Sequence, residues 1–131
     1  MAEKKDPLKD ELILIVDDDP DVRESVVAAF RSAGATTVAC GDGNSAVKLT
    51  HEKKPRLVIL DMMLPGQSGF LVLEKIKGYE EAPFVIMITA NEGKRHRQFA
   101  TGLGADLYLQ KPVSLEQLLD AARELVVQSP A

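Results

Sequence analysis

Short apolar runs alternate along the chain with longer stretches in which apolar residues recur at helical spacing. The runs cover residues 12–16, 36–39, 57–60, 84–88 and 107–109. The first, third and fourth runs are continuously apolar and rich in β-branched residues, which is typical of strands covered by helices on both faces. Strand–helix alternation of this kind predicts right-handed βαβ crossovers and a parallel sheet. The pattern therefore predicts a doubly wound α/β domain with five strands and five helices.

Several expected helices carry signals at their ends. Asp19 stands directly before a proline, which suits an N-cap, and Gly34 is expected to end the same helix. Ser114 and Gln117 have the spacing of a capping box at the start of the last helix. Gly78 is expected to close the third helix.

Length, composition and charge limit the possible functions. The 131 residues suit a single domain, and 45% hydrophobic with 27% charged residues is usual for a soluble globular chain. The net charge of -4 argues against direct binding to nucleic acid or to an anionic membrane surface. The apolar runs are far shorter than the roughly 20 residues that span a bilayer, so we expect no membrane insertion. Cys40 is the single cysteine and cannot form an internal disulfide, which favours a cytoplasmic location.

The domain is expected to cover residues 12–128. Residues 1–11 are highly charged and lack the apolar core of a signal peptide, so we expect them to form a flexible leader. Residues 129–131 are expected to form a C-terminal tail. The sequence shows no internal repeat and no linker, which leaves two alternatives: a free-standing domain, or a domain excised from a longer protein.

Polar side chains follow four of the five apolar runs. They are Asp17, Asp18 and Asp19 after the first run, Asp61 after the third, Thr89 after the fourth and Lys111 after the fifth. In an open parallel sheet the functional crevice lies outside the carboxyl ends of the strands. We therefore expect these side chains to converge on one pocket.

Neighbouring carboxylates repel one another unless a proton or a cation compensates them. Two unit charges about 4 Å apart repel by roughly 4 kcal/mol at an effective dielectric constant of 20. Oxygen ligands without a His/Cys cluster favour Mg²⁺ over zinc. With the ammonium of Lys111 and the hydroxyl of Thr89, this set is suited to phosphoryl transfer onto Asp61.

Each of these residues also has a simpler explanation when taken alone. Residues 17–19 would serve as a helix-capping turn, Asp61 as an ordinary strand-end aspartate, Thr89 as a structural residue and Lys111 as a surface lysine. Their placement at the ends of four strands carries the inference.

Four motifs together resemble a known family. They are Ile-Val-Asp-Asp-Asp-Pro at residues 15–20, Asp-Met-Met-Leu-Pro-Gly-Gln-Ser-Gly at 61–69, Thr-Ala at 89–90 and Gly-Ala-Asp-Leu-Tyr-Leu-Gln-Lys-Pro at 104–112. Over roughly residues 11–127 the chain resembles the receiver domain of two-component response regulators, similar to the single-domain, CheY-like chemotaxis regulators. The resemblance implies a flavodoxin-like sheet with strand order 2-1-3-4-5.

The resemblance implies that Asp61 is phosphorylated. It also implies a Mg²⁺ site made by Asp17, Asp18, Asp61 and the backbone carbonyl of Met63, in which Asp17 acts largely through water. Asp19 is expected to remain a helix cap and not to bind the metal.

The resemblance further assigns roles to three residues on the fourth and fifth strands. Thr89 and Tyr108 would be the switch residues, and Lys111 would bind the phosphoryl group. The peptide bond between Lys111 and Pro112 would be cis, an isomer that is uncommon in folded proteins.

The implied partners are a sensor histidine kinase or a histidine phosphotransfer protein, and a downstream target protein. The signal would pass through the face formed by the fourth helix, the fifth strand and the fifth helix. The chain would be a regulatory phosphoacceptor and not an enzyme. Val113 stands where dimerising relatives carry Phe, so we expect a monomer or a weak dimer.

Two alternatives from other classes compete with this interpretation. A phosphatase with an aspartyl-phosphate intermediate needs an Asp two residues after the nucleophile, where this chain has Met63. A pseudo-receiver would have lost an acidic residue, the acceptor or the lysine, and this chain keeps all of them.

Met63, and Asn91 two residues after Thr89, lie on the route of hydrolytic water in this family. Because Met63 has no polar side chain to position that water, we expect slow to moderate self-dephosphorylation.

Some features remain open at this stage. The fourth helix is expected over residues 92–101, and its basic run at 94–97 is either a solvated face or a docking site for an acidic partner. His51 and His96 are expected to be exposed. Gly69 is either a simple loop glycine or a site of close backbone approach, and residues 65–66 are expected to form a turn.

Overall fold

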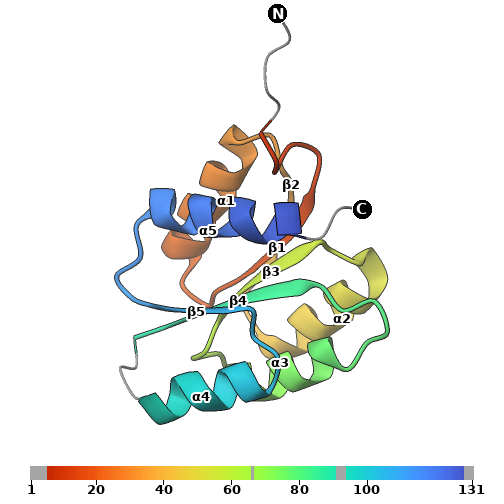
Figure 1. Cartoon of the computed structure of the whole chain (residues 1–131), viewed down its shortest axis with the longest axis vertical. Helices are drawn as coiled ribbons and strands as arrows, with labels where there is room; N and C mark the ends of the chain where they lie inside the picture. The colour runs from red at the N-terminus through yellow and green to blue at the C-terminus, as the bar shows by residue number, and fades with distance from the viewer. Residues whose placement is uncertain (1–5, 66, 91–93, 129–131) are drawn as a thin grey trace, which may run out of the picture.

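The computed structural model describes residues 6–65, 67–90 and 94–128, and they form a parallel sheet covered by helices (Figure 1). The strands are β1 (Leu12–Val16), β2 (Thr36–Cys40), β3 (Leu57–Asp61), β4 (Phe84–Thr89) and β5 (Leu107–Gln110). The helices are α1 (Pro20–Ser32), α2 (Gly43–Lys53), α3 (Gly69–Lys77), α4 (Lys94–Gly102) and α5 (Leu115–Gln128). The strand order is β2-β1-β3-β4-β5, which confirms the predicted doubly wound fold.

The register of the sheet brings the carboxyl ends of the strands to one edge. At this edge the final pairs of neighbouring strands are Val16↔Cys40, Val16↔Leu60, Asp61↔Ile88 and Thr89↔Gln110. All four ladders are parallel, so the residues that follow each strand emerge on the same side of the molecule. The strand order changes direction at β1, the position where open sheets form their binding crevice.

The helices form two layers, one on each face of the sheet. Figure 1 shows α1 and α5 on one side and α2, α3 and α4 on the other. Along β1, Ile13 and Ile15 belong to the apolar cluster with α1 and α5, whereas Leu14 and Val16 belong to the opposite cluster. Successive side chains of a strand point to opposite faces. Both faces of β1 are covered, which explains why its sequence is continuously apolar.

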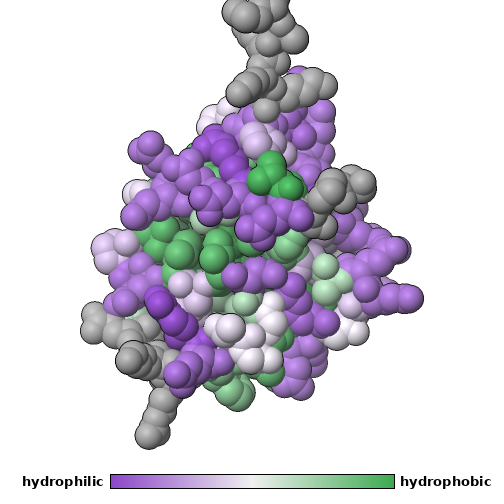
Figure 2. Space-filling model, viewed as in Figure 1, coloured by the Kyte–Doolittle hydropathy of each residue, from purple (hydrophilic) through white to green (hydrophobic). Residues whose placement is uncertain are grey.

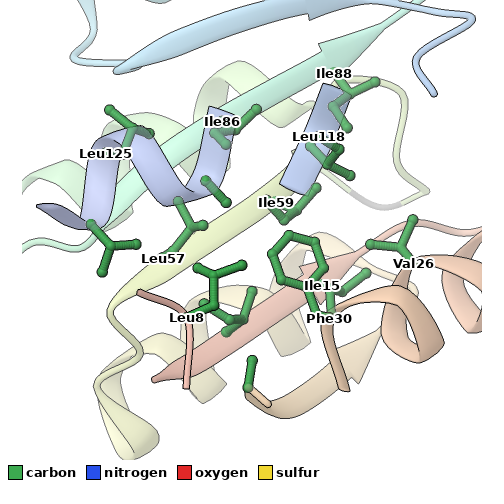
Figure 3. Packing of buried hydrophobic residues seen from close by; sticks show 14 residues of the cluster. Leu8, Ile15, Val26, Phe30, Leu57, Ile59, Ile86, Ile88, Leu118 and Leu125 are labelled. Atoms are coloured by element: carbon green, nitrogen blue, oxygen red, sulfur yellow. The ribbon is translucent and has the colours of Figure 1, made fainter. Parts of the chain in front are cut away.

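The cluster between the sheet and the α1–α5 layer is shown in Figure 3. Phe30 of α1 is fully buried, and Leu118 and Leu125 of α5 are 2% and 5% exposed. They pack with residues of the central strands, including Ile15 and Ile59. Full burial of a side chain of this kind contributes about 1.5–3 kcal/mol. The two long helices are therefore fixed against the sheet by their apolar faces.

The segment before β1 is packed against the domain, and the expectation of a flexible leader over residues 1–11 was wrong for residues 6–11. Leu8 is fully buried in the cluster of Figure 3. The Asp6 carboxylate accepts a hydrogen bond from Nη2 of Arg123 in α5 at 2.8 Å, which holds the pKa of Asp6 below its ordinary value. The Asp10 N–H donates to the Gly34 carbonyl at 2.9 Å. Residues 1–5 and the expected tail, residues 129–131, lie outside the described residues.

The expected helix ends agree with the structure. Asp19 is the N-cap of α1 and accepts hydrogen bonds from the N–H groups of the first turn. Ser114 and Gln117 exchange hydrogen bonds of 3.0 and 3.2 Å, which is the capping box expected for α5. Gly78 is the C-cap of α3. The helix expected over residues 92–101 is observed at Lys94–Gly102, and its first two expected residues lie outside the described part of the chain, as does Gly66.

Candidate functional site

Three carboxylates lie together at the carboxyl edge of the sheet. One oxygen each of Asp17, Asp18 and Asp61 lies within 4.8 Å of the others. Asp17 and Asp61 are buried, whereas Asp18 is exposed. The β1–α1 loop supplies the first two, and the end of β3 supplies the third. The parallel register of β1 and β3 is what makes them neighbours.

The β1–α1 loop is held at several points. The Asp17 N–H donates to the Cys40 carbonyl at 3.2 Å, and Oδ1 of Asp17 accepts from the Asp19 N–H at 2.9 Å. The Asp17 carbonyl accepts a hydrogen bond of 2.8 Å from Nη1 of Arg23 in α1. Asp19 uses its own side chain to cap α1 and does not join the carboxylate cluster. Arg23 was not singled out in the sequence, because no motif or periodic signal links an arginine to a carbonyl six residues earlier.

The β3–α3 segment places the Asp61 carboxylate. Oδ1 of Asp61 accepts a hydrogen bond from the Met63 N–H at 3.1 Å, and the Met62 N–H donates to the Ile88 carbonyl in β4 at 2.9 Å. The Gly69 N–H donates to the Met62 carbonyl at 2.8 Å. A Cβ on Gly69 would lie 2.6 Å from the Met62 Cα. Gly69 is therefore a site of close backbone approach, the second of the two interpretations left open by the sequence.

Lys111 supplies a cation to the cluster. Its Nζ lies 3.2 Å from Oδ2 of Asp61 and 3.7 Å from Oδ2 of Asp17. The Lys111 N–H donates to the Thr89 carbonyl at 2.7 Å, which joins the end of β4 to the segment after β5. The peptide bond between Lys111 and Pro112 is cis.

The electrostatics of the cluster oppose ionisation of the Asp17 carboxyl. Burial raises the pKa of the Asp17 carboxyl, and the charges of Asp61 and Asp18 add to this effect. The hydrogen bond from Asp19 and the charge of Lys111 act in the opposite direction but do not cancel it. For Lys111, burial disfavours the ammonium, but the negative charges of Asp61 and Asp17 outweigh burial and raise its pKa. One lysine does not balance three carboxylates, so the site favours a further cation.

The donor set fits Mg²⁺. All three clustered side chains offer carboxylate oxygens, and neither His nor Cys belongs to this group of described residues. Hard oxygen ligands of this kind bind Mg²⁺ and leave coordination positions for water or phosphate oxygens.

The comparison with known families decides the identity of the chain. The family model for response regulator receiver domains matches residues 13–123. The chain belongs to this family. Receiver domains are the regulatory domains of two-component signalling systems.

Curated relatives of this receiver domain are transcription regulators. The chain is 35% identical over 114 residues to the probable transcriptional regulatory protein TcrX of Mycobacterium tuberculosis, covering 87% of this chain and 49% of the relative. It is 38% identical over 106 residues to the transcriptional activator protein PfeR of Pseudomonas aeruginosa, covering 81% of this chain and 34% of the relative. The chain thus spans about half or less of the length of these relatives.

Solved structures show the same receiver fold. A CheY-like response regulator receiver domain protein from Methanospirillum hungatei superposes with a TM-score of 0.87 at 26% identity, covering 92% of this chain and 96% of the other. The signal receiver domain of the putative response regulator NarL from Mycobacterium tuberculosis gives a TM-score of 0.85 at 26% identity, covering 92% and 99%.

The residues expected to act as switches lie on β4 and β5 of this receiver domain. Thr89 is fully buried at the end of β4. Tyr108 is half-buried on β5, with the guanidinium of Arg97 lying 5.7 Å from its ring centroid. Its hydroxyl is buried and has no hydrogen-bond partner among the residues that the structure describes. Met63 is 67% exposed, and Asn91 lies outside the described residues.

The histidines differ from one another in exposure. His51 is exposed, as expected. The expectation that His96 is exposed was wrong, because its ring stacks on Phe70 with centroids 5.8 Å apart and its Nδ1 is buried. The contact joins the start of α4 to α3, which the local sequence did not indicate. Of the basic run at 94–97, the side chains of the first two residues are not described, and Arg97 is exposed.

A cavity of about 590 Å³ adjoins the carboxylates of the receiver domain. Asp61 and Lys111 are among its lining residues, and Val22, Val26 and Leu118 contribute apolar side chains from α1 and α5. The described residues contain no helix long and apolar enough to cross a membrane.

Proposed function

We propose that Asp61 of this receiver domain accepts a phosphoryl group from a sensor histidine kinase or a histidine phosphotransfer protein. The observation that carries the proposal is the position of the Asp61 carboxylate, which is buried beside two further carboxylates and 3.2 Å from the Lys111 ammonium. A nucleophile, a fixed cation and a set of Mg²⁺ ligands thus meet at one point, which is what phosphoryl transfer requires.

In the proposed transfer, a carboxylate oxygen of Asp61 forms a P–O bond as the P–N bond of the donor's phosphohistidine breaks. The imidazole of the donor keeps the electron pair of the broken bond. The Met63 N–H orients the Asp61 carboxylate by donating to Oδ1, and the Lys111 ammonium stabilises the charge on the transferred group. Asp17, Asp18, Asp61 and the Met63 carbonyl would hold Mg²⁺, which when bound neutralises charge on the carboxylates and on the phosphoryl oxygens.

Phosphorylation would shift an existing equilibrium between two conformations of the domain. The phosphoryl group offers a new acceptor to the Thr89 hydroxyl and to Lys111, so it favours the conformation in which both approach it. The Tyr108 hydroxyl is buried without a hydrogen-bond partner among the described residues. This supports a role in the change, because a conformation that gives it a partner recovers the free energy of the missing hydrogen bond.

The signal would pass to a target protein through the face formed by α4, β5 and α5. Leu107, Leu109 and Val113 are only half-buried on β5 and just after it. Figure 2 shows hydrophobic residues gathered beneath α5 on the face that it views, among predominantly hydrophilic surroundings. The exposed Arg97 of α4 adds a positive charge that suits an acidic partner surface. The net charge of -4 supports a protein target over nucleic acid, and Val113 supports a monomer or weak dimer.

The test is phosphorylation by acetyl phosphate, a small acyl phosphate, in the presence of Mg²⁺, followed by intact-protein mass spectrometry. We expect the wild type to gain one phosphoryl group, Asp61→Asn to gain none, and the exposed control Asp120→Asn to behave like the wild type. Because the chain has no tryptophan, a second measurement follows amide NMR signals on addition of beryllofluoride and Mg²⁺. The proposal is wrong if beryllofluoride produces no change that depends on Asp61.

A further inference from the structure

Arg23 connects the loop that carries Asp17 and Asp18 to the first helix. Its Nη1 donates to the Asp17 carbonyl at 2.8 Å, and its side chain is half-buried. The Asp17 N–H is held at the same time by the Cys40 carbonyl at 3.2 Å. The peptide unit that leads from Asp17 into Asp18 is therefore fixed by a side chain of α1, while the preceding one is fixed by β2.

The Arg23 guanidinium does not form an ion pair with the carboxylates of the cluster. In the described part of the chain no carboxylate oxygen lies within 4.0 Å of the Arg23 guanidinium, whereas Lys111 pairs with both Asp17 and Asp61. A guanidinium that paired with these carboxylates would compete with a metal ion for the same oxygens. Arg23 instead holds the backbone and leaves the carboxylate oxygens of the cluster to a cation.

Gly41 provides the space in which the Arg23 guanidinium lies. A Cβ at this position would be 2.9 Å from Nη1 of Arg23, which is too close, but 3.6 Å from the Asp17 carbonyl and 3.7 Å from the Asp18 Cα, which are ordinary contacts. A methyl group at Gly41 would therefore displace the guanidinium without pressing on the acidic loop itself.

We propose that Arg23 is a positioning residue for the Mg²⁺ site, acting through its hydrogen bond to the Asp17 carbonyl. This inference rests on the proposed function, because it assumes that Asp17 and Asp18 bind Mg²⁺. Groups that orient metal ligands without binding the metal change the affinity about 10–100-fold when they are removed. Since Arg23 orients a ligand through the backbone, we expect the lower end of that range, about tenfold.

The direction of the effect separates this role from a purely electrostatic one. Removal of a positive charge near an acidic cluster strengthens the binding of a cation if charge alone matters. Loss of a positioning hydrogen bond weakens the binding, because the carboxylates must then be ordered when the metal binds. Arg23→Met removes both the charge and the donor, so the sign of the change in affinity decides between the two.

The experiment is isothermal titration calorimetry with MgCl₂ on the folded, unphosphorylated chain. We expect the Kd of Arg23→Met to rise about tenfold relative to the wild type. The matched control is Arg31→Met, in the same helix, whose guanidinium donates to Oγ1 of Thr37 at 2.9 Å and lies on the exposed surface. Its Kd should stay within about twofold of the wild type, since it touches no part of the acidic loop.

Gly41→Ala tests the same hydrogen bond with Arg23 in place. It should also weaken Mg²⁺ binding, and the double variant Arg23→Met, Gly41→Ala should be no weaker than Arg23→Met alone, because both changes remove one interaction. If Arg23→Met does not fold, the Kd of Gly41→Ala for Mg²⁺ tests the inference by itself. An unchanged or lower Kd in these variants overturns the inference and leaves the proposed function intact. A wild type that binds no Mg²⁺ overturns the proposed metal site and the inference together.

Discussion

The Asp61 carboxylate is placed by backbone geometry as much as by charge. The Met63 N–H and the Lys111 ammonium contact its two oxygens at 3.1 and 3.2 Å. Behind it, Gly69 begins α3 so close to β3 that its hypothetical Cβ would meet the backbone of residues 61 and 62 at 2.6–2.9 Å. Backbone atoms cannot yield as a flexible side chain can, so this packing fixes the turn that carries Asp61.

Gly69→Ala should destabilise the domain by about 1–3 kcal/mol, the cost of forcing extra atoms into a packed region. Urea denaturation measures the free energy of unfolding. Gly102→Ala is the control, because nothing lies within 4 Å of its hypothetical Cβ, and alanine in a helix is expected to be neutral or stabilising. Equal stability of the wild type and Gly69→Ala would show that the close approach is not rigid.

At the residue scale we also propose that Met63 affects the lifetime of the phosphoryl group. Met63, two residues after Asp61, is 67% exposed, and its side chain has no group that positions water. Met63→Asn, which adds a hydrogen-bonding amide, should therefore shorten the half-life of the phosphorylated domain, whereas Leu71→Asn on α3 should not. The decay is followed by mass spectrometry with Mg²⁺ retained. A wild-type half-life of seconds would contradict slow self-dephosphorylation.

At the scale of elements, residues 6–11 act as part of the α1–α5 layer. Leu8 belongs to the core cluster of Figure 3. Asp6 pairs with Arg123 of α5 at 2.8 Å. The segment joins the start of β1 to the helix that forms part of the proposed output face. We therefore propose that the folded domain includes residues 6–11 as well as the expected residues 12–128.

Leu8→Ala should lower the free energy of unfolding by about 2–5 kcal/mol, as expected for truncation of a fully buried leucine. Leu71→Ala, at a leucine that is 42% exposed on α3, serves as the control and should cost about 1 kcal/mol or less. Thermal or urea unfolding gives both values. A small effect at Leu8 would mean that the segment is detached in solution.

At the scale of the whole molecule, the carboxylates clustered at the site lower the stability of the domain when no divalent cation is bound. The core is covered on both faces of the sheet, but its carboxyl edge gathers three carboxylates against one lysine. The raised pKa of Asp17 reflects this unfavourable environment, because burial and the neighbouring negative charges favour its protonated form. Native domains are stable by only about 5–15 kcal/mol, so one such group matters for the entire fold.

The pH dependence of stability follows from the sign of that shift. Because the pKa of Asp17 is higher in the folded state than its ordinary value of 3.8, the folded state binds the proton more tightly. The stability that this group contributes is fully present below the unfolded pKa and is lost as the pH rises through the folded pKa. Asp17→Asn does not titrate and keeps an Oδ1 acceptor for the Asp19 N–H.

Without divalent cations, Asp17→Asn should therefore gain stability relative to the wild type as the pH rises from about 3.8 to 7. Urea denaturation at several pH values in EDTA measures the difference. Saturating Mg²⁺ should stabilise the wild type more than the variant, because only the wild type keeps the complete ligand set. A difference that stays constant over this pH range would contradict the shift.

The sequence by itself determined the features that depend on local pattern. Short apolar runs predicted the strands, and the polar residues after them predicted the candidate site, because a parallel sheet brings every carboxyl end to one edge. Local hydrogen bonds also sufficed for the helix caps, since Asp19 and the pair Ser114 and Gln117 bond only to near neighbours in the chain.

Only the tertiary structure decided the features that depend on contacts between distant segments. Leu8 is one apolar residue among charged ones and shows no periodicity, yet α5 and the sheet bury it. His96 lies in a basic run, yet its ring stacks on Phe70 of α3. Arg23 donates to the Asp17 carbonyl beside Gly41, which follows β2 and leaves room for the guanidinium. In each case the contact depends on a segment from another part of the fold, which no local pattern of residues specifies.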